Sequence, residues 1–337
     1  TAGLVDQEKD ACAYRASTAM RAGLPEEPVL RELEAASLRL ARGAGAVLRR
    51  YQPGETRVDY KDEKGRDPVT EADLRVEEYL REEISRELPD HGIVAEEGTA
   101  TGPRDADYLW AIDPLDGTAN FVAGLPFYAV SIGLLYRGMP VVGSLFLPST
   151  LAGDGVLHAR AGGGAFWEGE PLKMLSRTTP HPSRLVSLPA GFGRAFALRS
   201  ERGRSLGEPR TMGSIACEMV LVARGVLQLS VFAGPRIWDV AAGVVLIREA
   251  GGEVLEWRHG GWKPLQGFLV APDRKDESHA EALRRWSLPL LVGAPELVAK
   301  VASRARPRRR PSRYILRRVR SLWGRVKRGR PWNPSRK

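Results

Sequence analysis

Apolar residues recur every three or four positions in two segments near the N-terminal end of the chain. Residues 29–50 carry them at Leu33, Ala36, Leu40, Ala44 and Val47, and residues 70–88 carry them at Val76, Leu80, Ile84 and Leu88. This spacing gathers the apolar side chains on one side of an α-helix. We therefore predict two amphipathic helices, separated by a polar stretch over residues 53–67.

Shorter apolar runs bounded by glycine and proline predict strands in the middle of the chain. We expect strands at residues 108–112, 127–136, 141–147 and 227–232, and one more ahead of Gly162. Helical patterns return at residues 211–226 and 239–250, and Gly251 ends the second of these helices. Because helices and strands alternate along the chain, we predict an α/β fold of the layered α+β type.

The chain has 337 residues, a length that suits about two domains or one large domain. We divide it into a weakly structured lead-in, an N-terminal α+β subdomain that carries the metal-binding motifs described below, a C-terminal α/β subdomain and a basic tail. The four parts are residues 1–28, 29–150, 151–285 and 286–337.

The net charge of +10 is concentrated at the C-terminal end. Residues 300–337 contain 16 Lys and Arg and no acid, which leaves 51 − 16 = 35 bases against 41 acids in the remainder. The body of the protein is therefore mildly acidic. Within the tail, Ile315, Val319, Leu322 and Val326 have the spacing of one helical face, and bases stand between them. A basic amphipathic helix suits an anionic membrane surface, a nucleic acid or a partner protein, and the alternative is a disordered charged extension.

Two absences bear on location. No uncharged apolar run reaches the roughly 18 residues that a membrane-spanning helix needs. The two cysteines, Cys12 and Cys217, stand alone, without the spacing of metal ligands, and fit a reducing compartment. We expect a cytoplasmic protein, with peripheral membrane contact through the tail as a further option.

The most informative segment is Tyr108–Phe121, where an apolar run leads directly into two acids and a turn. Asp113 and Asp116 stand at the end of the predicted strand, and Pro114 and Gly117 interrupt the backbone there. Two carboxylates and a freed carbonyl, that of Leu115, are hard oxygen ligands of the kind that Mg²⁺ prefers. Both acids could also be ordinary turn residues. That alternative does not explain why the buried strand runs straight into them.

Four motifs together resemble the inositol monophosphatase family of Mg²⁺-dependent, Li⁺-sensitive phosphatases. In chain order they are Val69–Asp73, Val94–Glu97, the Asp-Pro-Leu-Asp-Gly-Thr sequence of residues 113–118, and Trp238–Gly243 followed by Glu249–Gly252. The resemblance covers roughly residues 30 to 275. It implies stacked helix and sheet layers with a site between two subdomains, and a homodimer.

The resemblance also implies a set of site residues. A first Mg²⁺ would be held by Glu96, Asp113 and the carbonyl of Leu115, and a second by Asp113, Asp116 and Asp239. Asp73 would help to place a third, weaker ion. Thr118 and Glu96 would orient the attacking water, and the backbone N–H groups of Gly117 and Thr118 would face the phosphate. The substrate would be flanked by Asp116, Gly213 and Ser214.

Two of these acids have a structural alternative. Asp239 stands at the start of a predicted helix and could be its N-cap. Thr70 and Asp73 have the spacing of a capping box at the start of the second helix. Either acid could combine the two roles.

Two residues bear on the choice of substrate. Relatives that hydrolyse inositol phosphate carry an acid seven residues before the aspartate of the Trp-Asp motif, and that position is Phe232 here. Arg236 adds a cation close by. We therefore expect the phosphatase chemistry to be kept and the selectivity for inositol to be weaker.

Three functions follow from this reading. The first is a Mg²⁺-dependent phosphomonoesterase that cleaves a small phosphorylated metabolite by direct attack of a metal-activated water. The second is a bisphosphate phosphatase acting on 3′-phosphoadenosine nucleotides or fructose 1,6-bisphosphate. The third belongs to another class: a scaffold that binds RNA, protein or membrane through the basic tail.

Overall fold

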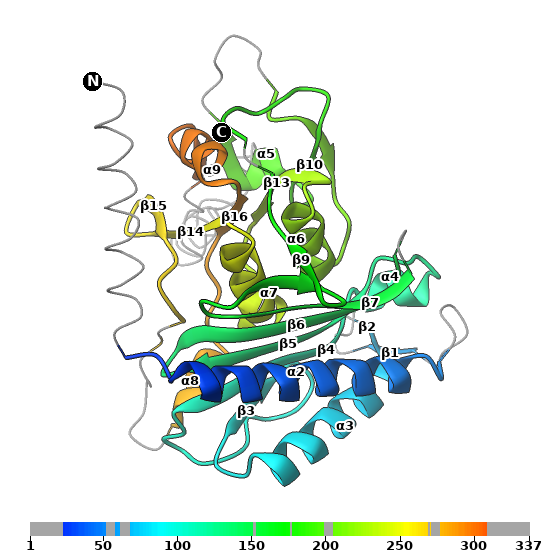
Figure 1. Cartoon of the computed structure of the whole chain (residues 1–337). Coiled ribbons are helices and arrows are strands. Elements are labelled where there is room, and N and C mark those ends of the chain that lie inside the picture. Colours follow the sequence, from blue (N-terminus) through cyan, green and yellow to red (C-terminus); the bar gives the residue numbers. More distant parts are fainter. Residues whose placement is uncertain are drawn as a thin grey trace, which may run out of the picture.

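The computed structural model describes residues 23–51, 58–60, 68–150, 153–175, 177–198, 205–268, 270 and 277–308. Helices and strands are stacked in alternating layers, in the order helix, sheet, helix, sheet, helix (Figure 1). The layered α/β prediction is thus confirmed. In the described part of the chain, no helix is both long and apolar enough to span a membrane.

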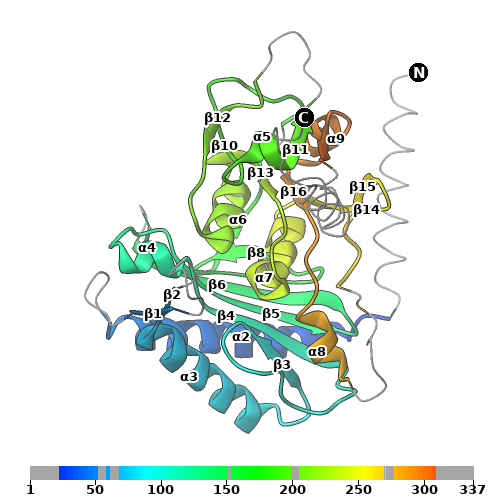
Figure 2. The ribbon, with the colours of Figure 1, turned by 180° about the vertical axis from the view of Figure 1, so that it is seen from behind.

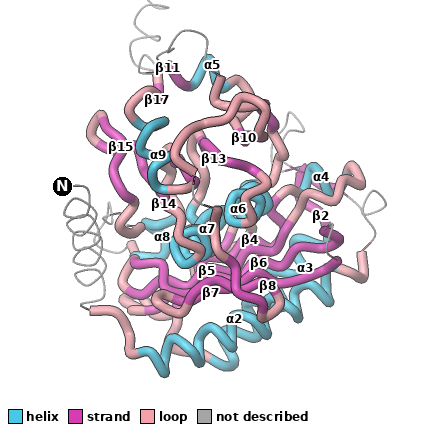
Figure 3. The backbone as a smooth tube through the Cα atoms, turned by 45° about the horizontal axis from the view of Figure 1, so that its top comes forward, coloured by secondary structure: helices cyan, strands magenta, loops and turns pink. Residues whose placement is uncertain are grey.

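The first layer is a pair of amphipathic helices, α2 (Glu27–Leu48) and α3 (Glu71–Glu87). Both were predicted from the spacing of their apolar residues. The spacing places Leu40 of α2 and Leu80 of α3 on the buried sides of their helices. Both belong to one apolar cluster, which they share with the strands above them. The two helices lie side by side beneath the first sheet (Figures 1 and 3).

The first sheet has seven strands in chain order, with β3 parallel to β4 and the others antiparallel. They are β3 (Gly92–Ala95), β4 (Tyr108–Asp116), β5 (Ala129–Tyr136), β6 (Met139–Thr150), β7 (Gly153–Arg160), β8 (Gly164–Trp167) and β9 (Glu170–Leu172). A separate two-stranded sheet joins β1 (Val58–Tyr60) to β2 (Pro68–Thr70). The strand expected at residues 108–112 continues to Asp116, so the acidic motif itself is part of β4.

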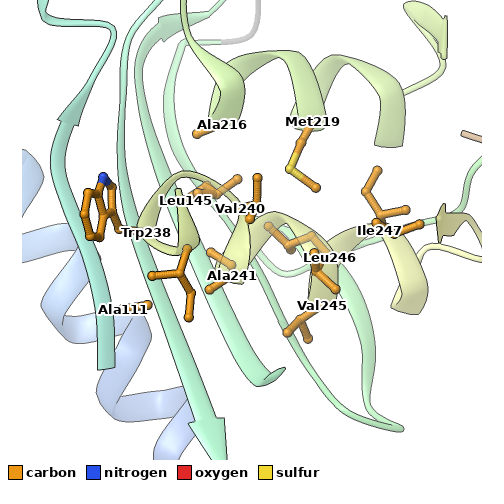
Figure 4. Packing of buried hydrophobic residues seen from close by; sticks show 14 of the residues in the cluster. Ala111, Leu145, Ala216, Met219, Trp238, Val240, Ala241, Val245, Leu246 and Ile247 are labelled. Atoms are coloured by element: carbon orange, nitrogen blue, oxygen red, sulfur yellow. The ribbon is translucent and has the colours of Figure 1, made fainter. Parts of the chain in front are cut away.

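The middle layer consists of α6 (Ile215–Ala223) and α7 (Ile237–Glu249), which separate the two sheets (Figure 2). Figure 4 shows Val240, Ala241 and Leu246 of α7 packed among residues of the first sheet and α6. Both helices are apolar on nearly every side, as expected for a layer that is covered on both faces. They are shorter or shifted relative to the segments 211–226 and 239–250 that the sequence predicts.

Glycines in the first sheet allow α7 to approach closely. A Cβ atom on Gly133 would lie 2.6 Å from the Cβ of Ala241, and one on Gly143 would lie 2.4 Å from the carbonyl oxygen of Ala242. Neither contact leaves room for a side chain. The glycines therefore fix the distance between α7 and the sheet.

The second sheet has six strands in the order β12-β10-β13-β16-β14-β15. In that order they span Glu208–Arg210, Leu185–Ser187, Leu227–Phe232, Leu290–Gly293, Glu253–Arg258 and Gly261–Pro264. The outer layer contains α5 (Phe192–Ala195), α9 (Pro295–Ala302) and the pair formed by β11 (Phe196–Leu198) and β17 (Ala305–Pro307). Helix α4 (Thr118–Val122) follows β4, and α8 (His279–Leu283) lies beside β3.

The C-terminal part of the fold differs from the expected basic tail beginning at residue 286. Strand β16 lies between β13 and β14, and α9 packs behind it. Residues 290–307 therefore belong to the second sheet and to the outer layer that covers it. The expected amphipathic helix over residues 314–330 lies outside the described residues.

Candidate active site

The acidic motif of β4 forms a kink at the end of the strand. Pairing between β4 and β5 shifts register between Asp113 and Asp116, and the Leu115 N–H turns back to donate to Asp113 Oδ1 at 3.0 Å. Gly117 then adopts φ 95°, and a Cβ there would lie 2.8 Å from the carbonyl oxygen of Phe127. Only glycine fits this position, and it starts α4 immediately after the two acids.

Asp73 joins the start of α3 to this kink. Its Oδ2 accepts the N–H of Thr70 at 2.8 Å and the Thr70 hydroxyl at 2.5 Å, so the capping box predicted from the sequence is present. Its Oδ1 lies 3.0 Å from the hydroxyl of Thr118, which is also 3.0 Å from the carbonyl oxygen of Leu115. Asp73 thus caps a helix and faces the candidate water-orienting residue at once.

Asp116 connects the first sheet to the middle layer. Its Oδ2 accepts the Ser214 hydroxyl and the Ala216 N–H, both at 2.6 Å. Ser214 is the N-cap of α6, and its hydroxyl oxygen accepts the N–H of Cys217 at 3.2 Å. A carboxylate from β4 therefore occupies the N-terminal end of α6.

Asp239 occupies the first turn of α7. The sequence suggested an N-cap at this position, but the helix begins at Ile237 and the cap is Arg236, whose N–H donates to Asp239 Oδ2 at 2.8 Å. The starts of α3, α4, α6 and α7 all carry residues of the site. Because helix N-termini present unpaired N–H groups and a partial positive charge, this arrangement favours anions.

Burial, and after it the charges of neighbouring acids, raise the pKa of Asp113, Asp116 and Asp239. Burial raises the pKa of Asp113 well above its ordinary value, and the charges of Glu96, Asp116 and Asp239 raise it further. Burial and Asp116 do the same for Asp239, while burial raises the pKa of Asp116 to about 7. Four acids in mutual electrostatic reach cannot all stay charged at neutral pH unless a cation compensates them.

The donor set fits Mg²⁺ because every ligand available is a carboxylate or carbonyl oxygen. Glu96 directly follows β3, and its N–H donates to the carbonyl of Ile112 at 3.2 Å, beside the acidic motif. Across the described ranges, however, no three His, Cys, Asp or Glu side chains are gathered as tightly as a metal-ligand set. Several of the carboxylate oxygens bond to protein donors instead. The fit to a metal therefore rests on the oxygen chemistry and on the shared charge.

The residues proposed for substrate contact fall into different surroundings. Gly213, with φ 79°, precedes Ser214 at the start of α6. Arg236 is exposed at the start of α7. Phe232 is only 4% exposed, and its ring packs in the core shared by the middle layer and the second sheet.

Asn120 is a site-building residue that the sequence analysis missed. Its Nδ2 donates to the carbonyls of Phe127 at 2.6 Å and Met212 at 2.8 Å. It thereby ties the loop before Gly213 to the turn after Gly117. An asparagine in a turn is common, so nothing in the sequence indicates a contact that spans 92 residues.

Clustered buried carboxylates at the end of a strand, surrounded by helix N-termini, define a site suited to metal-assisted chemistry on a phosphate. The sequence model of the inositol monophosphatase family matches residues 29–287, and the chain belongs to this family. It is therefore a phosphoric monoester hydrolase of a metal-dependent family, acting on small phosphorylated substrates.

Individual relatives agree with this assignment. The chain is 33% identical over 243 residues to the Nus factor SuhB of Pasteurella multocida, which covers 70% of this chain and 89% of the relative. It is 32% identical to the fructose-1,6-bisphosphatase/inositol-1-monophosphatase of Aquifex aeolicus, over 64% of this chain and 82% of the relative. The solved inositol monophosphatase of Anabaena superposes with a TM-score of 0.60 at 29% identity, covering 81% of this chain and 95% of that one.

Proposed function

We propose that the protein hydrolyses a small phosphomonoester with the help of Mg²⁺, by direct attack of water on phosphorus. The observation that carries the proposal is Asp113. It is 1% exposed, and burial raises its pKa, which the charges of three further acids raise again. Such a cluster weakens the fold when its members ionise, so its presence is best explained by bound cations.

In this proposal the chain provides ligands for two to three ions. Glu96, Asp113 and the Leu115 carbonyl would hold one, and Asp113, Asp116 and Asp239 would hold another. Asp73 supports a third from a greater distance. When bound, the metal lowers the pKa of water and neutralises charge on the phosphoryl oxygens.

The remaining residues orient the reactants. The hydroxyl of Thr118 is held by Asp73 and the Leu115 carbonyl, and with Glu96 it aligns the attacking water. The N–H groups of Gly117 and Thr118 bind the phosphate at the start of α4. This assignment needs no nucleophilic side chain and no covalent phosphoenzyme.

A phosphate-release assay over a panel of metabolites tests this proposal. We expect turnover with Mg²⁺, none in excess chelator, and inhibition by Li⁺. Full turnover in chelator would refute the metal mechanism. Asp105→Asn is a suitable control because Asp105 is an exposed acid outside the motif.

The panel also decides the substrate. Phe232 replaces a hydrogen-bond acceptor, which removes roughly 1 to 3 kcal/mol of discrimination per missing contact. We expect inositol 1-phosphate to be cleaved without strong preference over sugar and nucleotide phosphates. Fructose 1,6-bisphosphate and 3′-phosphoadenosine nucleotides belong in the panel because one relative carries the first activity in its name and because Arg236 offers an exposed cation.

We propose a second role for the C-terminal extension, with anionic membrane as its first partner. Residues 309–337 contain 12 Lys and Arg and no acid, and Ile315, Val319, Leu322 and Val326 share one helical face in the sequence. Truncation should start after Arg308, because its N–H donates to the Ala195 carbonyl and its Nε to that of Phe196, within the fold.

Vesicle co-sedimentation of the full chain and the truncated chain, at low and high salt, tests this role. We expect the truncation to abolish salt-sensitive binding and to leave phosphate release unchanged. Equal binding by both forms would refute the role, and binding to RNA but not to anionic vesicles would reverse the choice of partner. We also propose a cytoplasmic homodimer, for which light scattering gives the mass.

A further inference from the structure

The loop that carries Glu96 is held by two side chains, Glu77 of α3 and Arg284 after α8. On the side of α3, Glu77 accepts the N–H of Glu97 at 2.9 Å and the N–H of Gly98 at 2.7 Å. Glu77 is only 4% exposed, and the Nε of Arg81 fixes it at 2.8 Å. The donors of the loop are therefore bound by a buried carboxylate.

The carbonyl groups of the same loop are bound by Arg284, which directly follows α8. Its Nη1 donates to the carbonyl oxygens of Ala95 and Gly98, the latter at 2.6 Å, and its Nη2 donates to that of Glu96 at 3.2 Å. A guanidinium suits this task because it presents five donors in a rigid plane. Three backbone carbonyls within residues 95–98 are thus tied to one side chain.

Arg284 also reaches the start of α7, which carries the proposed ligand Asp239. Its guanidinium carbon lies 5.1 Å from the ring centre of Trp238, a distance typical of a cation–π contact. Trp238 immediately precedes Asp239, and its carbonyl accepts the Ser131 hydroxyl at 2.9 Å. One arginine therefore touches the loop of Glu96 and the first turn of α7.

We propose that Arg284 is a positioning residue that holds the ligand loop of Glu96 in place against the start of α7, which carries Asp239. The inference rests on the proposed function, because it assigns Arg284 a role in metal binding. Glu96 and Asp239 come from different layers and from segments more than 140 residues apart. A shared contact fixes their separation before any ion binds.

Titration calorimetry with Mg²⁺ alone tests the proposal on the full chain. Arg284→Met keeps the aliphatic stem beside Trp238 and removes the donors, while Arg284→Lys keeps the charge. Arg285→Met is the matched control, since Arg285 is the next residue but pairs with Glu277. Loss of a residue that orients metal ligands typically lowers metal affinity by about 10- to 100-fold.

We expect Arg284→Met to weaken Mg²⁺ binding by about 10-fold or more, Arg284→Lys to recover part of the loss, and Arg285→Met to bind like the wild type. The rate of phosphate release by Arg284→Met should recover as Mg²⁺ is raised, with the KM for the phosphate ester little changed. Hydrogen exchange should become faster at the amides of Glu97 and Gly98 and stay unchanged in α9.

Three results would overturn the proposal. They are wild-type Mg²⁺ affinity in a folded Arg284→Met protein, an equal loss in Arg285→Met, and failure of every Arg284 variant to fold, which would make the residue a general structural one. Circular dichroism monitors folding. A wild-type chain that binds Mg²⁺ but releases no phosphate would refute the proposed function. The Mg²⁺ affinities of the Arg284 variants would still decide whether Arg284 positions the loop.

Discussion

Replacement of Asp116 by asparagine should stabilise the protein in chelator while weakening its stabilisation by Mg²⁺. Asp116 accepts two hydrogen bonds through one oxygen, and the amide oxygen of asparagine can accept the same two from Ser214 and Ala216. The substitution therefore keeps the contacts and removes the buried charge. The variant therefore separates the effect of the buried charge on stability from the effect of the hydrogen bonds.

The size of the effect follows from the pKa. Burial raises the pKa of Asp116 from 3.8 to about 7, so the folded state binds its proton more tightly than the unfolded chain. Stability must then fall as pH rises from about 4 to about 7 and stay level above that. At about 1.4 kcal/mol for each difference of one in pKa, ionisation costs the fold about 4 kcal/mol at pH 8 and less than half of that at pH 5.

Urea unfolding at pH 5 and pH 8, in chelator and in Mg²⁺, measures these differences. In chelator we expect Asp116→Asn to exceed the wild type by up to about 4 kcal/mol at pH 8 and by less at pH 5. Mg²⁺ should stabilise the wild type, because an ion that binds only the folded state shifts the equilibrium. It should stabilise the variant less, because the ion assigned to Asp113, Asp116 and Asp239 loses a ligand while the ion assigned to Glu96, Asp113 and the Leu115 carbonyl does not. The exposed Asp105→Asn serves as control. A variant less stable than the wild type at pH 8 in chelator, or a gain independent of pH, would refute the reasoning.

Three further predictions concern single residues. Asp113→Asn should lower phosphate release by roughly 10³-fold or more while circular dichroism stays native, because the proposed bridge between ions is lost; near-native turnover would reduce Asp113 to a turn residue. Thr118→Ala should slow release severely yet keep Mg²⁺ affinity, measured by calorimetry, and a collapse of affinity would contradict its role toward water. Gly133→Ala should lower the free energy of unfolding in urea by about 1 to 3 kcal/mol, since its Cβ would lie 2.6 Å from Ala241, and an unchanged value would show that α7 can move away.

The sequence predicted the elements whose signals are local. Helices α2 and α3 were found because apolar residues such as Leu40 and Leu80 follow the helical period. The acidic motif was found because Asp113 and Asp116 interrupt an apolar run within a few residues. Each of these signals lies inside one element, so one stretch of sequence contains it.

The contacts that shape the site could not be predicted in this way. Asp116 meets Ser214 across 98 residues, Asn120 meets Met212 across 92, and Arg284 meets Ala95 across 189. Polar side chains in loops carry no periodic pattern that would announce such partners. Strand β16 was missed for a related reason, because its four residues, three of them apolar, are too short a run to stand out before a basic segment.

The central place of β16 has a consequence for how the chain folds as it is synthesised. Its neighbours β13 and β14 emerge from the ribosome earlier, yet they hydrogen-bond to β16 and not to each other. Domains generally form from the N-terminal side during translation, so the first sheet can assemble while the second still has two open edges. Unpaired strand edges invite association with other chains. For this protein the interval of greatest exposure to aggregation falls between the synthesis of β14 and that of residue 293.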